Sequence, residues 1–325
     1  MRKFLFVLSI VIVSVSCKKN IKNTKLSGAV FGTSYSIIYD SEVNYQAQFD
    51  SLFYVINKSM STYQVNSYIS KLNRNEANEI DDHFITVFEA SKDIYSKTDG
   101  AFDPTIGAVV NAWDFGPEGK IVNLDSLKID SLMLSVGFNK ILRSENKISK
   151  PQATFIDFNA IAKGYGVDVI GEYLESEKIN NYLVEIGGEI RVKGQNTEKQ
   201  SRWKVGVENP NFDGKQSILK AIALQDEAMA TSGTYRKFKV DEHGNRYAHI
   251  IDAKTGYPSK TNLLSISVIA ENCMIADAYA TAFKAMGIEQ VKLFLSKHTE
   301  LKAFLIFENE LKELETLALN GFPES

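Results

Sequence analysis

The apolar residues in the first half of the chain recur mainly at helical spacing. Within Asn44–Met60 they fall three or four positions apart, at Phe49, Phe53 and Ile56, as expected of a helix with one buried face. An alternating stretch rich in strand-forming residues, Val30–Tyr39, predicts a strand before this helix. The apolar spacing and flanking turn residues predict further helices over Ile85–Thr98, Ile106–Trp113 and Asp125–Ser135.

The second half of the chain is richer in strand-forming residues. Helices are predicted over Ala160–Ser176, Ala276–Met286 and Ile288–Ser296. Strands are predicted over Thr154–Phe158, Tyr182–Ile186, Ile190–Lys193, Trp203–Glu208, Leu219–Leu224, Ala228–Ser232, Tyr247–Ile251, Leu264–Ala270 and Lys302–Phe307. No Pro/Ser-rich linker or internal repeat divides the body. We therefore expect one α+β domain over residues 27–325, with mixed or antiparallel sheets, flanking helices and a helical lobe at one edge.

The first residues have the pattern of a secretory signal. Arg2 and Lys3 precede an apolar run, Phe4–Val13, that is too short to span a bilayer comfortably. Small residues then lead to Cys17, which resembles the lipid-bearing cysteine of bacterial lipoproteins, although Ser14 stands where Leu is usual. We therefore expect residues 1–17 to be a lipoprotein signal peptide.

A lipid on Cys17 would hold the protein at a bacterial membrane surface, facing the periplasm or the cell exterior. The polar residues 18–26 would then form a tether. An ordinary signal peptide cut near Cys17 is the alternative, whereas Lys18 and Lys19 end the apolar run too early for a transmembrane anchor.

Composition and charge narrow the classes of partner. The 325 residues are 44% hydrophobic and 24% charged, with a formal net charge of −3, so a globular fold is expected and nucleic acid is not. Two cysteines do not make a disulfide framework. Cys273 lies beside Met274 and Ile275, and we expect its thiol to be buried and inert.

The chain lacks a P-loop, an HExxH helix and a GxSxG elbow. It carries instead a series of short polar segments that contain or adjoin glycine or small residues. Each has an ordinary structural explanation alone, such as a turn, a helix cap or a core helix. The segments are Phe31–Tyr35, Met60–Ser67, Asp99–Thr105, Asp157–Tyr165, Glu185–Ile190, Ala230–Tyr235, His249–Gly256 and Ala276–Thr281.

In this order the segments resemble the ApbE-type family of FAD:protein FMN transferases, from about Val30 to Gly287. The matching motifs include MSTY, GAFDPTIG, AIAKGY, EIGGEIRVKG, ATSGTYRKF, HIIDAKTGYP and ADAYATAF. Ala253 stands where the family often has Pro, and Phe31 stands where Met is usual. The resemblance implies a two-part α+β fold related to the T-fold. It also implies Mg²⁺-dependent cleavage of FAD, attachment of FMN to a threonine of a target protein, and release of AMP.

A divalent ion and a fixed cation are the usual means of stabilising charge on a pyrophosphate. Asp277 and Thr281 are four residues apart on one predicted helix, so their oxygens face the same side and suit Mg²⁺. The resemblance adds the backbone carbonyl of Ala160 as a third metal ligand. The alternative for Asp277 is a solvated helix charge.

The resemblance assigns further residues to FAD. Lys163 lies in the first turns of a predicted helix, where a phosphate is favoured; the alternative is a surface lysine. Tyr63 and Phe102 offer aromatic faces to a flavin, and the loop Thr231–Gly233 is small enough for close approach. The implied FAD contacts are Phe31, Tyr63, Ala101, Phe102, Asp103, Asp157, Lys163 and Ile251.

His249 is the best candidate for a general base, because a threonine hydroxyl must lose its proton when it attacks phosphorus. It lies in a predicted strand and begins a polar motif, while His83, His243 and His298 lie in polar or terminal settings. A strand histidine without a catalytic role is the alternative.

Two other functions remain open from the sequence. An FAD pyrophosphatase would give water the place of the threonine, and a non-catalytic FAD-binding lipoprotein would need no metal pair. The resemblance suggests that the target is a respiratory flavin-carrying subunit in the same compartment.

Overall fold

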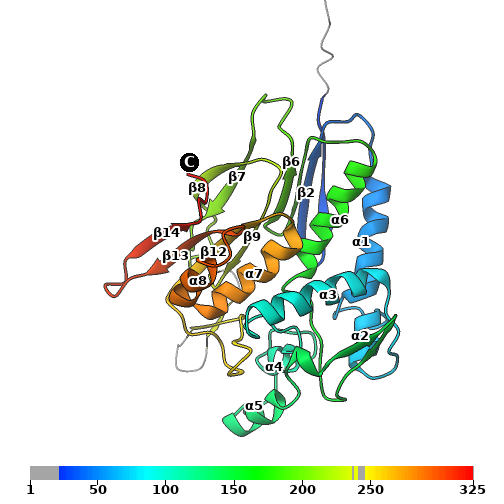
Figure 1. Ribbon diagram of the computed structural model, residues 1–325, viewed down its shortest axis with the longest axis vertical. Helices are drawn as coiled ribbons and strands as arrows, with labels where there is room; N and C mark the ends of the chain where they lie inside the picture. Colours follow the sequence, from blue (N-terminus) through cyan, green and yellow to red (C-terminus); the bar gives the residue numbers. More distant parts are fainter. Residues whose placement is uncertain (1–21, 236–237, 241–245, 325) are drawn as a thin grey trace, which may run out of the picture.

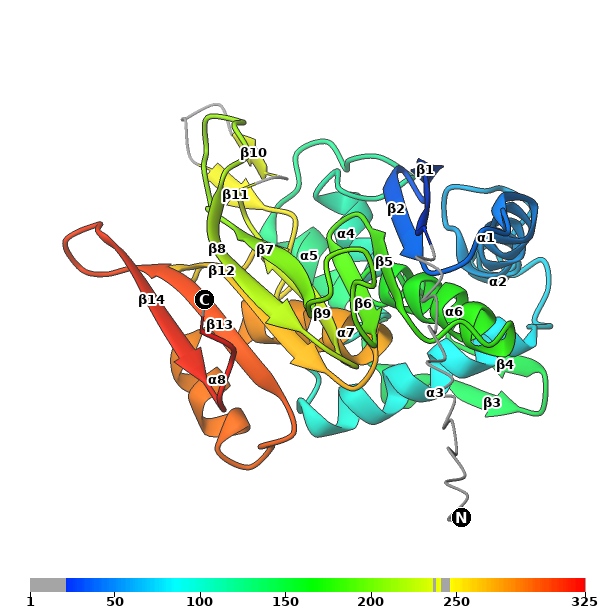
Figure 2. The same ribbon diagram turned by 90° about the horizontal axis from the view of Figure 1, so that it is seen from above.

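An antiparallel sheet of eight strands forms the centre of the computed structural model, which describes residues 22–235, 238–240 and 246–324 (Figures 1 and 2). Every neighbouring pair in the sheet is antiparallel. In spatial order the strands are β1 (Thr24–Val30), β2 (Thr33–Tyr39), β5 (Tyr182–Ile186), β6 (Glu189–Lys193), β9 (Ala228–Gly233), β12 (Leu263–Ala270), β13 (Lys302–Glu308) and β14 (Leu314–Leu319).

Helices cover one face of this sheet. The helix α6 (Ala162–Ser176) packs with α1 (Gln46–Met60) over β2 and β5, while α7 (Cys273–Met286) lies over β9 and β12. The helix α3 (Asp82–Lys97) packs against α1 and α7, and α8 (Ile288–Leu295) follows α7. Figure 1 shows α6 and α7 side by side in front of the sheet. Their shared core is built from the apolar faces that the helical spacing predicted.

The opposite face is covered by a hairpin of β7 (Trp203–Glu208) and β8 (Ile218–Leu224). Its apolar side chains, with Trp203 the largest, pack against β6, β9, β12 and β13. The central strand β12 is therefore buried along its whole length. A second hairpin, β10 (Phe238–Val240) and β11 (Arg246–Ala248), lies beyond the end of β9.

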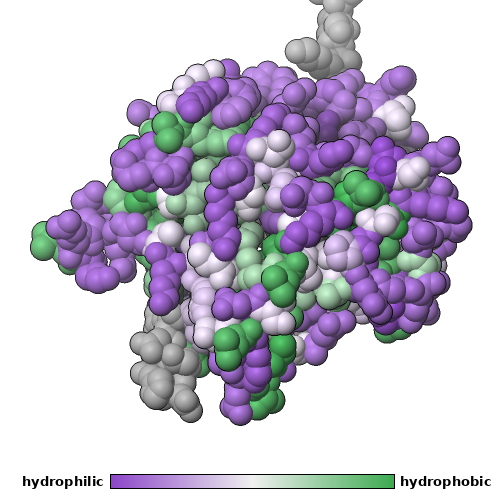
Figure 3. All heavy atoms as spheres, turned by 60° about the horizontal axis from the view of Figure 1, so that its bottom comes forward, coloured by the Kyte–Doolittle hydropathy of each residue, from purple (hydrophilic) through white to green (hydrophobic). Residues whose placement is uncertain are grey.

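Smaller elements fill the loops between α1 and α6. Figure 3 shows the surface at this end as largely hydrophilic with separate hydrophobic patches, and Leu127 and Leu134 are strongly exposed on or beside α5. These elements are α2 (Tyr68–Asn73), α4 (Gly107–Ala112), α5 (Ser126–Met133), the 3₁₀ turn η1 (Phe138–Lys140), β3 (Leu142–Ser144) and β4 (Lys147–Ser149).

The structure confirms the α+β class, the antiparallel sheets and most of the predicted elements. One prediction that it corrects is the single strand Val30–Tyr39, which is the second half of a hairpin whose turn holds Phe31 and Gly32 at φ values of 50° and 75°. Its first strand, β1, begins at Thr24, inside the predicted tether of residues 18–26. Most side chains of β1 are exposed, so its sequence is as polar as that of a linker. The segment is a strand because it pairs with β2.

Strand pairing, which a local pattern does not show, also explains the other differences from the predicted strands. Most of Thr154–Phe158 is buried, but the segment is not a strand, because only Phe155 forms a bridge, with Ile106. The predicted strand Tyr247–Ile251 ends at Ala248. The edge strand β14 escaped prediction because most of its side chains are exposed and give no clear alternation.

The signal peptide and most of the tether were predicted for residues that the structure does not describe. Residues 1–17, including Cys17, fall outside the described residues, as do residues 18–21 of the tether. Within the part that is described, no helix combines the length and apolar character needed to cross a membrane.

Candidate active site

Asp277 and Lys163, two of the predicted site residues, lie where the start of α6 touches α7. The backbone amide of Gly164, in the first turn of α6, donates a hydrogen bond of 3.0 Å to Oδ2 of Asp277 on α7. A Cβ atom at Gly164 would lie 2.3 Å from the carbonyl oxygen of Cys273 and 2.9 Å from Cβ of Asp277. Glycine is therefore required for the two helices to approach this closely.

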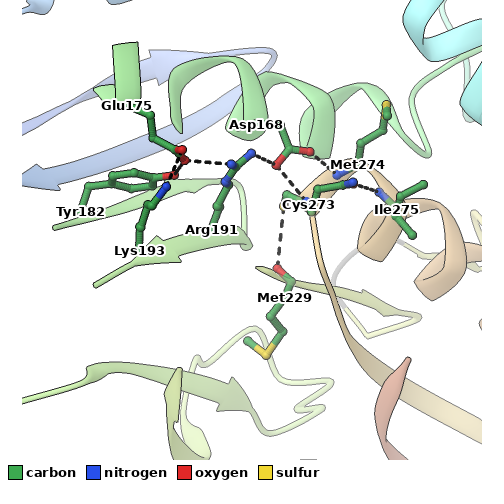
Figure 4. Close-up of polar contacts among 10 residues, drawn as sticks. Asp168, Glu175, Tyr182, Arg191, Lys193, Met229, Cys273, Met274 and Ile275 are labelled. Carbon is green, nitrogen blue, oxygen red and sulfur yellow. Dashed lines mark hydrogen bonds and ion pairs between the residues drawn. The ribbon is translucent and has the colours of Figure 1, made fainter. Parts of the chain in front are cut away.

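The first turn of α7 is held by the Asp168 side chain, which extends from α6 (Figure 4). Its two carboxylate oxygens accept hydrogen bonds from the amides of Cys273, at 2.9 Å, and Met274, at 2.7 Å. Arg191 of β6 donates to the same carboxylate at 2.9 Å and to Glu175 at 3.0 Å. This buried network fixes α7 relative to α6 and β6, because it satisfies the first amides of the helix.

The predicted metal residues present three kinds of oxygen. Asp277 is 4% exposed, and burial raises the pKa of its carboxyl group. Thr281, one turn later on the same face of α7, has its Oγ1 3.2 Å from Oγ of Ser232 on β9. In a regular helix the Gly164 amide would donate to the carbonyl of Ala160; here it donates to Asp277, and no other described residue donates to that carbonyl.

A carboxylate, a hydroxyl and a carbonyl are the oxygen ligands that Mg²⁺ prefers. The burial of Asp277 excludes a solvated surface charge, and a bound cation would compensate for its desolvation. Across the described residues, no three side chains of His, Cys, Asp or Glu gather as a metal cluster. The residues present thus fit an ion held by mixed oxygen ligands, in which substrate or water completes the coordination.

Lys163 lies beside this set and is held by a residue that the sequence analysis did not assign. Its Nζ forms an ion pair of 2.6 Å with Oε1 of Glu189, the first residue of β6. Burial lowers the pKa of Lys163, but the carboxylates of Asp277 and Glu189 outweigh that effect and keep it above its ordinary value. Burial raises the pKa of Glu189 to about 7, against the opposing effect of Lys163.

Three of the predicted flavin residues lie in different surroundings. Tyr63 follows α1 and is 59% exposed, and burial followed by the charge of Asp157 raises its pKa. Asp157 accepts hydrogen bonds from the amide and side chain of Asn159 at 2.8 and 3.1 Å. Phe31 packs from the β1–β2 turn against α6, where a Cβ atom at Gly166 would meet its ring at 2.6 Å.

In the predicted flavin segment at residues 101–103, the side chains of Phe102 and Asp103 are buried within the fold. The ring of Phe102 is 2% exposed and belongs to the main core, so it does not offer the face to a flavin that the sequence analysis expected. Asp103 uses Oδ1 to accept from the amide and hydroxyl of Thr105, at 2.8 and 2.6 Å. Burial raises its pKa. Ala101 lines a surface cavity of about 460 Å³ between the ends of α3 and α7.

His249 directly follows β11, with its ring 6.2 Å from the ring of Phe115. Ile251, two residues later, is 7% exposed and packs with Val109 and Val136. The loop that follows is closed by an isolated bridge from Ile251 to Pro258. The role of His249 as a base stays a prediction.

Three buried charged residues near the site were missed by the sequence analysis. Glu189 lies within a recognised motif and Asp168 lies three residues after one, but only the fold shows that they contact Lys163 and the start of α7. Lys284 follows Asp277 by seven residues on α7, and its Nζ donates to Oγ1 of Thr261 at 3.2 Å. Burial lowers the pKa of Lys284 to about 8. Its position at helical spacing from Asp277 and Thr281 was the available signal.

Replacing Gly164 with alanine should destabilise the α6–α7 junction. The new methyl group would overlap a backbone carbonyl, which cannot rotate away. The free energy of unfolding should therefore fall by about 1–3 kcal/mol. Urea denaturation followed by circular dichroism measures this loss. Gly119→Ala is the control, since nothing lies within 4 Å of that site and only its φ of 78° is unfavourable. Equal losses in the two variants would contradict a tight junction.

The chain is similar to one family of known proteins in both sequence and structure. The model of the ApbE family matches residues 31–305. An FAD:protein FMN transferase of Vibrio cholerae is 36% identical over 303 residues, which are 89% of each chain. A protein of the same name from Haemophilus influenzae is 36% identical over 313 residues, or 91% of this chain and 89% of its own. The structure of the flavin transferase ApbE from Vibrio cholerae has a TM-score of 0.82 and 32% identity, covering 91% of this chain and 97% of its own. The chain, with its α6–α7 junction inside the matched region, therefore belongs to the ApbE family.

Proposed function

We propose that this protein is a Mg²⁺-dependent FAD:protein FMN transferase, which moves FMN from FAD to a threonine hydroxyl of a target protein and releases AMP. Relatives that match most of the chain carry the name FAD:protein FMN transferase. The observation that carries the proposal is the α6–α7 junction. There the Gly164 amide, next in sequence to Lys163, donates to the buried carboxylate of Asp277, and Thr281 follows one turn later on α7.

These residues match the charge of the substrate. FAD contains a pyrophosphate, and negative charge grows on the AMP side as the bond between its phosphates breaks. Mg²⁺, when held by Asp277, Thr281 and the Ala160 carbonyl, would supply positive charge to phosphate oxygens. Lys163 supplies a second positive charge from the protein, in the first turn of α6, where phosphate binding is favoured.

The transfer exchanges a phosphoanhydride bond for a phosphoester bond at the same phosphorus. The threonine oxygen of the target attacks the phosphorus of the FMN half, and the bond from that phosphorus to the oxygen of AMP breaks. The hydroxyl proton passes to a base, for which we propose His249. FAD is thus a substrate, bound through the segments that carry Phe31, Tyr63, Asp157 and Ile251.

Replacing Asp277 with asparagine should abolish Mg²⁺-dependent turnover without unfolding the protein. Asparagine can still accept the Gly164 amide, but it removes the only charged ligand proposed for the metal. We expect turnover to fall by more than about 100-fold, beyond the loss typical of residues that only support a ligand. The assay follows AMP release and covalent flavin on a purified target, with Thr281→Ser, which keeps the hydroxyl, as a control.

The same assay separates transfer from hydrolysis. Free FMN without a flavin-labelled target would show that water is the acceptor and that the protein is an FAD pyrophosphatase. Turnover in Asp277→Asn equal to that of the native protein would contradict the metal site.

Replacing His249 with alanine should slow the chemical step far more than it weakens FAD binding. Loss of a general base typically costs about 10²- to 10⁴-fold in rate. Single-turnover measurement of FMN transfer gives the rate, and flavin fluorescence titration gives the affinity. If affinity falls and the single-turnover rate does not, His249 contacts FAD and is not the base.

We also propose that the protein is exported and attached to a bacterial membrane through a lipid on Cys17. The basic start, short apolar run and small residues before Cys17 support this. Cys17→Ser should prevent incorporation of labelled fatty acid and release the protein from the membrane fraction, whereas Cys273→Ser should do neither. A Cys17→Ser protein that keeps its lipid label would contradict the anchor.

A further inference from the structure

Two lysine–glutamate pairs join α6 to β6, one near each end of the strand. At one end Lys163 of α6 pairs with Glu189 of β6 at 2.6 Å; at the other, Lys193 of β6 pairs with Glu175 of α6 at 2.5 Å. The two pairs differ in their surroundings. The side chain of Glu189 is 4% exposed, whereas that of Glu175 is 27% exposed and also binds Arg191.

The position of Glu189 is set by the backbone as well as by its ion pair. Gly187 and Gly188 form the turn between β5 and β6, with φ values of 63° and 106° that favour glycine. The amide of Gly187 donates to the carbonyl of Ser34 at 3.0 Å, and that of Gly188 donates to Glu185 at 2.7 Å. Glu189 follows directly and pairs with Ile186 in the strand register.

Burying the Glu189 carboxylate is unfavourable for the stability of the fold. Its Oε1 binds Lys163, while its Oε2 is buried and has no hydrogen-bond partner among the described residues. A buried ion pair is often no more stabilising than apolar residues of the same size, and a buried oxygen without a partner is unfavourable. The effect of this carboxylate on Lys163 offers a functional reason for its presence.

Two buried carboxylates lie close to Lys163: its ammonium group pairs with Glu189 at 2.6 Å, and the amide of the next residue, Gly164, donates to Asp277 at 3.0 Å. Asp277 and Glu189 both act on its charge, and Asp277 is the residue proposed to hold the metal. A lysine side chain is flexible, so without Glu189 its ammonium group would be drawn towards Asp277. There it would compete with a cation for the same carboxylate.

We propose that Glu189 is a positioning residue that holds the Lys163 ammonium group away from Asp277, which leaves that carboxylate for the metal and aims the ammonium group at a phosphate of FAD. This role rests on the proposed function, since it assigns Lys163 to the phosphate and Asp277 to Mg²⁺. Glu189 itself contacts neither the substrate nor the metal in this proposal. Its effect is transmitted through Lys163.

The test is the Mg²⁺ requirement of Glu189→Gln, which keeps the size of the side chain and removes its charge. We expect the Mg²⁺ concentration for half-maximal activity to rise by about 10- to 100-fold, the range typical of residues that support a metal ligand. The kcat at saturating Mg²⁺ should also fall, because the ammonium group is less well aimed. A merely structural role would lower stability and leave the Mg²⁺ requirement unchanged.

The matched control is Glu175→Gln, which removes the charge from the other α6–β6 pair. It should keep the native kcat and the native Mg²⁺ requirement. Circular dichroism and urea denaturation confirm that each variant is folded. If Glu189→Gln does not fold, Glu189→Asp replaces it, since it keeps the charge and withdraws the carboxylate from Lys163 by one methylene group. An unchanged Mg²⁺ requirement in the folded variant would overturn the proposal.

A second background separates positioning from direct metal binding. In Lys163→Met, the further change Glu189→Gln should leave the Mg²⁺ requirement unaltered, because no ammonium group remains to compete for Asp277. A rise of the same size in both backgrounds would mean that Glu189 binds the metal, and would overturn the proposal.

Failure of the proposed function is recognised independently. Calorimetric titration of each FAD-free protein with Mg²⁺ alone reports metal binding without any turnover. A native protein that binds Mg²⁺ but transfers no FMN would contradict the proposed function. A weaker Mg²⁺ affinity in Glu189→Gln than in Glu175→Gln would still support the positioning of Lys163.

Discussion

The hydrogen bond from the Gly164 amide to Asp277 is the contact on which the site depends. It joins the first turn of α6 to α7, and its length of 3.0 Å is possible only because Gly164 has no side chain. The carboxylate that serves the fold in this way is also the one that we propose as a metal ligand. The Asp168 carboxylate performs a related task nearby, because it accepts the first amides of α7 and binds Arg191 of β6. Two helices and a strand are thus fixed by polar contacts within a largely apolar core.

The buried charges at this junction would be better balanced if a cation and a phosphate group were bound. Asp277 and Glu189 are both buried, and Lys163 pairs with Glu189 while the next residue, Gly164, contacts Asp277. Burial raises the pKa of each carboxyl group, so their ionised forms are not fully compensated by Lys163. A divalent cation would add positive charge, and a pyrophosphate would add negative charge against Lys163. This balance favours a site that binds its metal and substrate together.

The residues assigned to flavin divide into two groups by their surroundings. Tyr63 is more than half exposed and lies near Asp157, which suits a group that meets a ligand. Phe102, Asp103 and Ile251 are instead buried and shape the loops that surround the site. Motif membership therefore did not say which side chains of these segments face outwards. Exposure decides that, and exposure is a property of the packed chain.

The sequence by itself determined the α+β class, most of the helices and strands, and the family. These are local properties, because apolar spacing follows the 3.6-residue and two-residue periods and motifs are read in order. The helical spacing of Asp277 and Thr281 also determined that their oxygens share one face of α7.

The tertiary structure alone decided the partners of the charged groups and the extent of the sheet. Glu189 lies 26 residues from Lys163, so no helical or strand period links them, and only the β5–β6 turn brings them together. In the same way β1 and β14 are strands because they pair with neighbours, although their exposed side chains give little pattern. Contacts between distant segments depend on how the whole chain packs, and a local pattern does not contain that information.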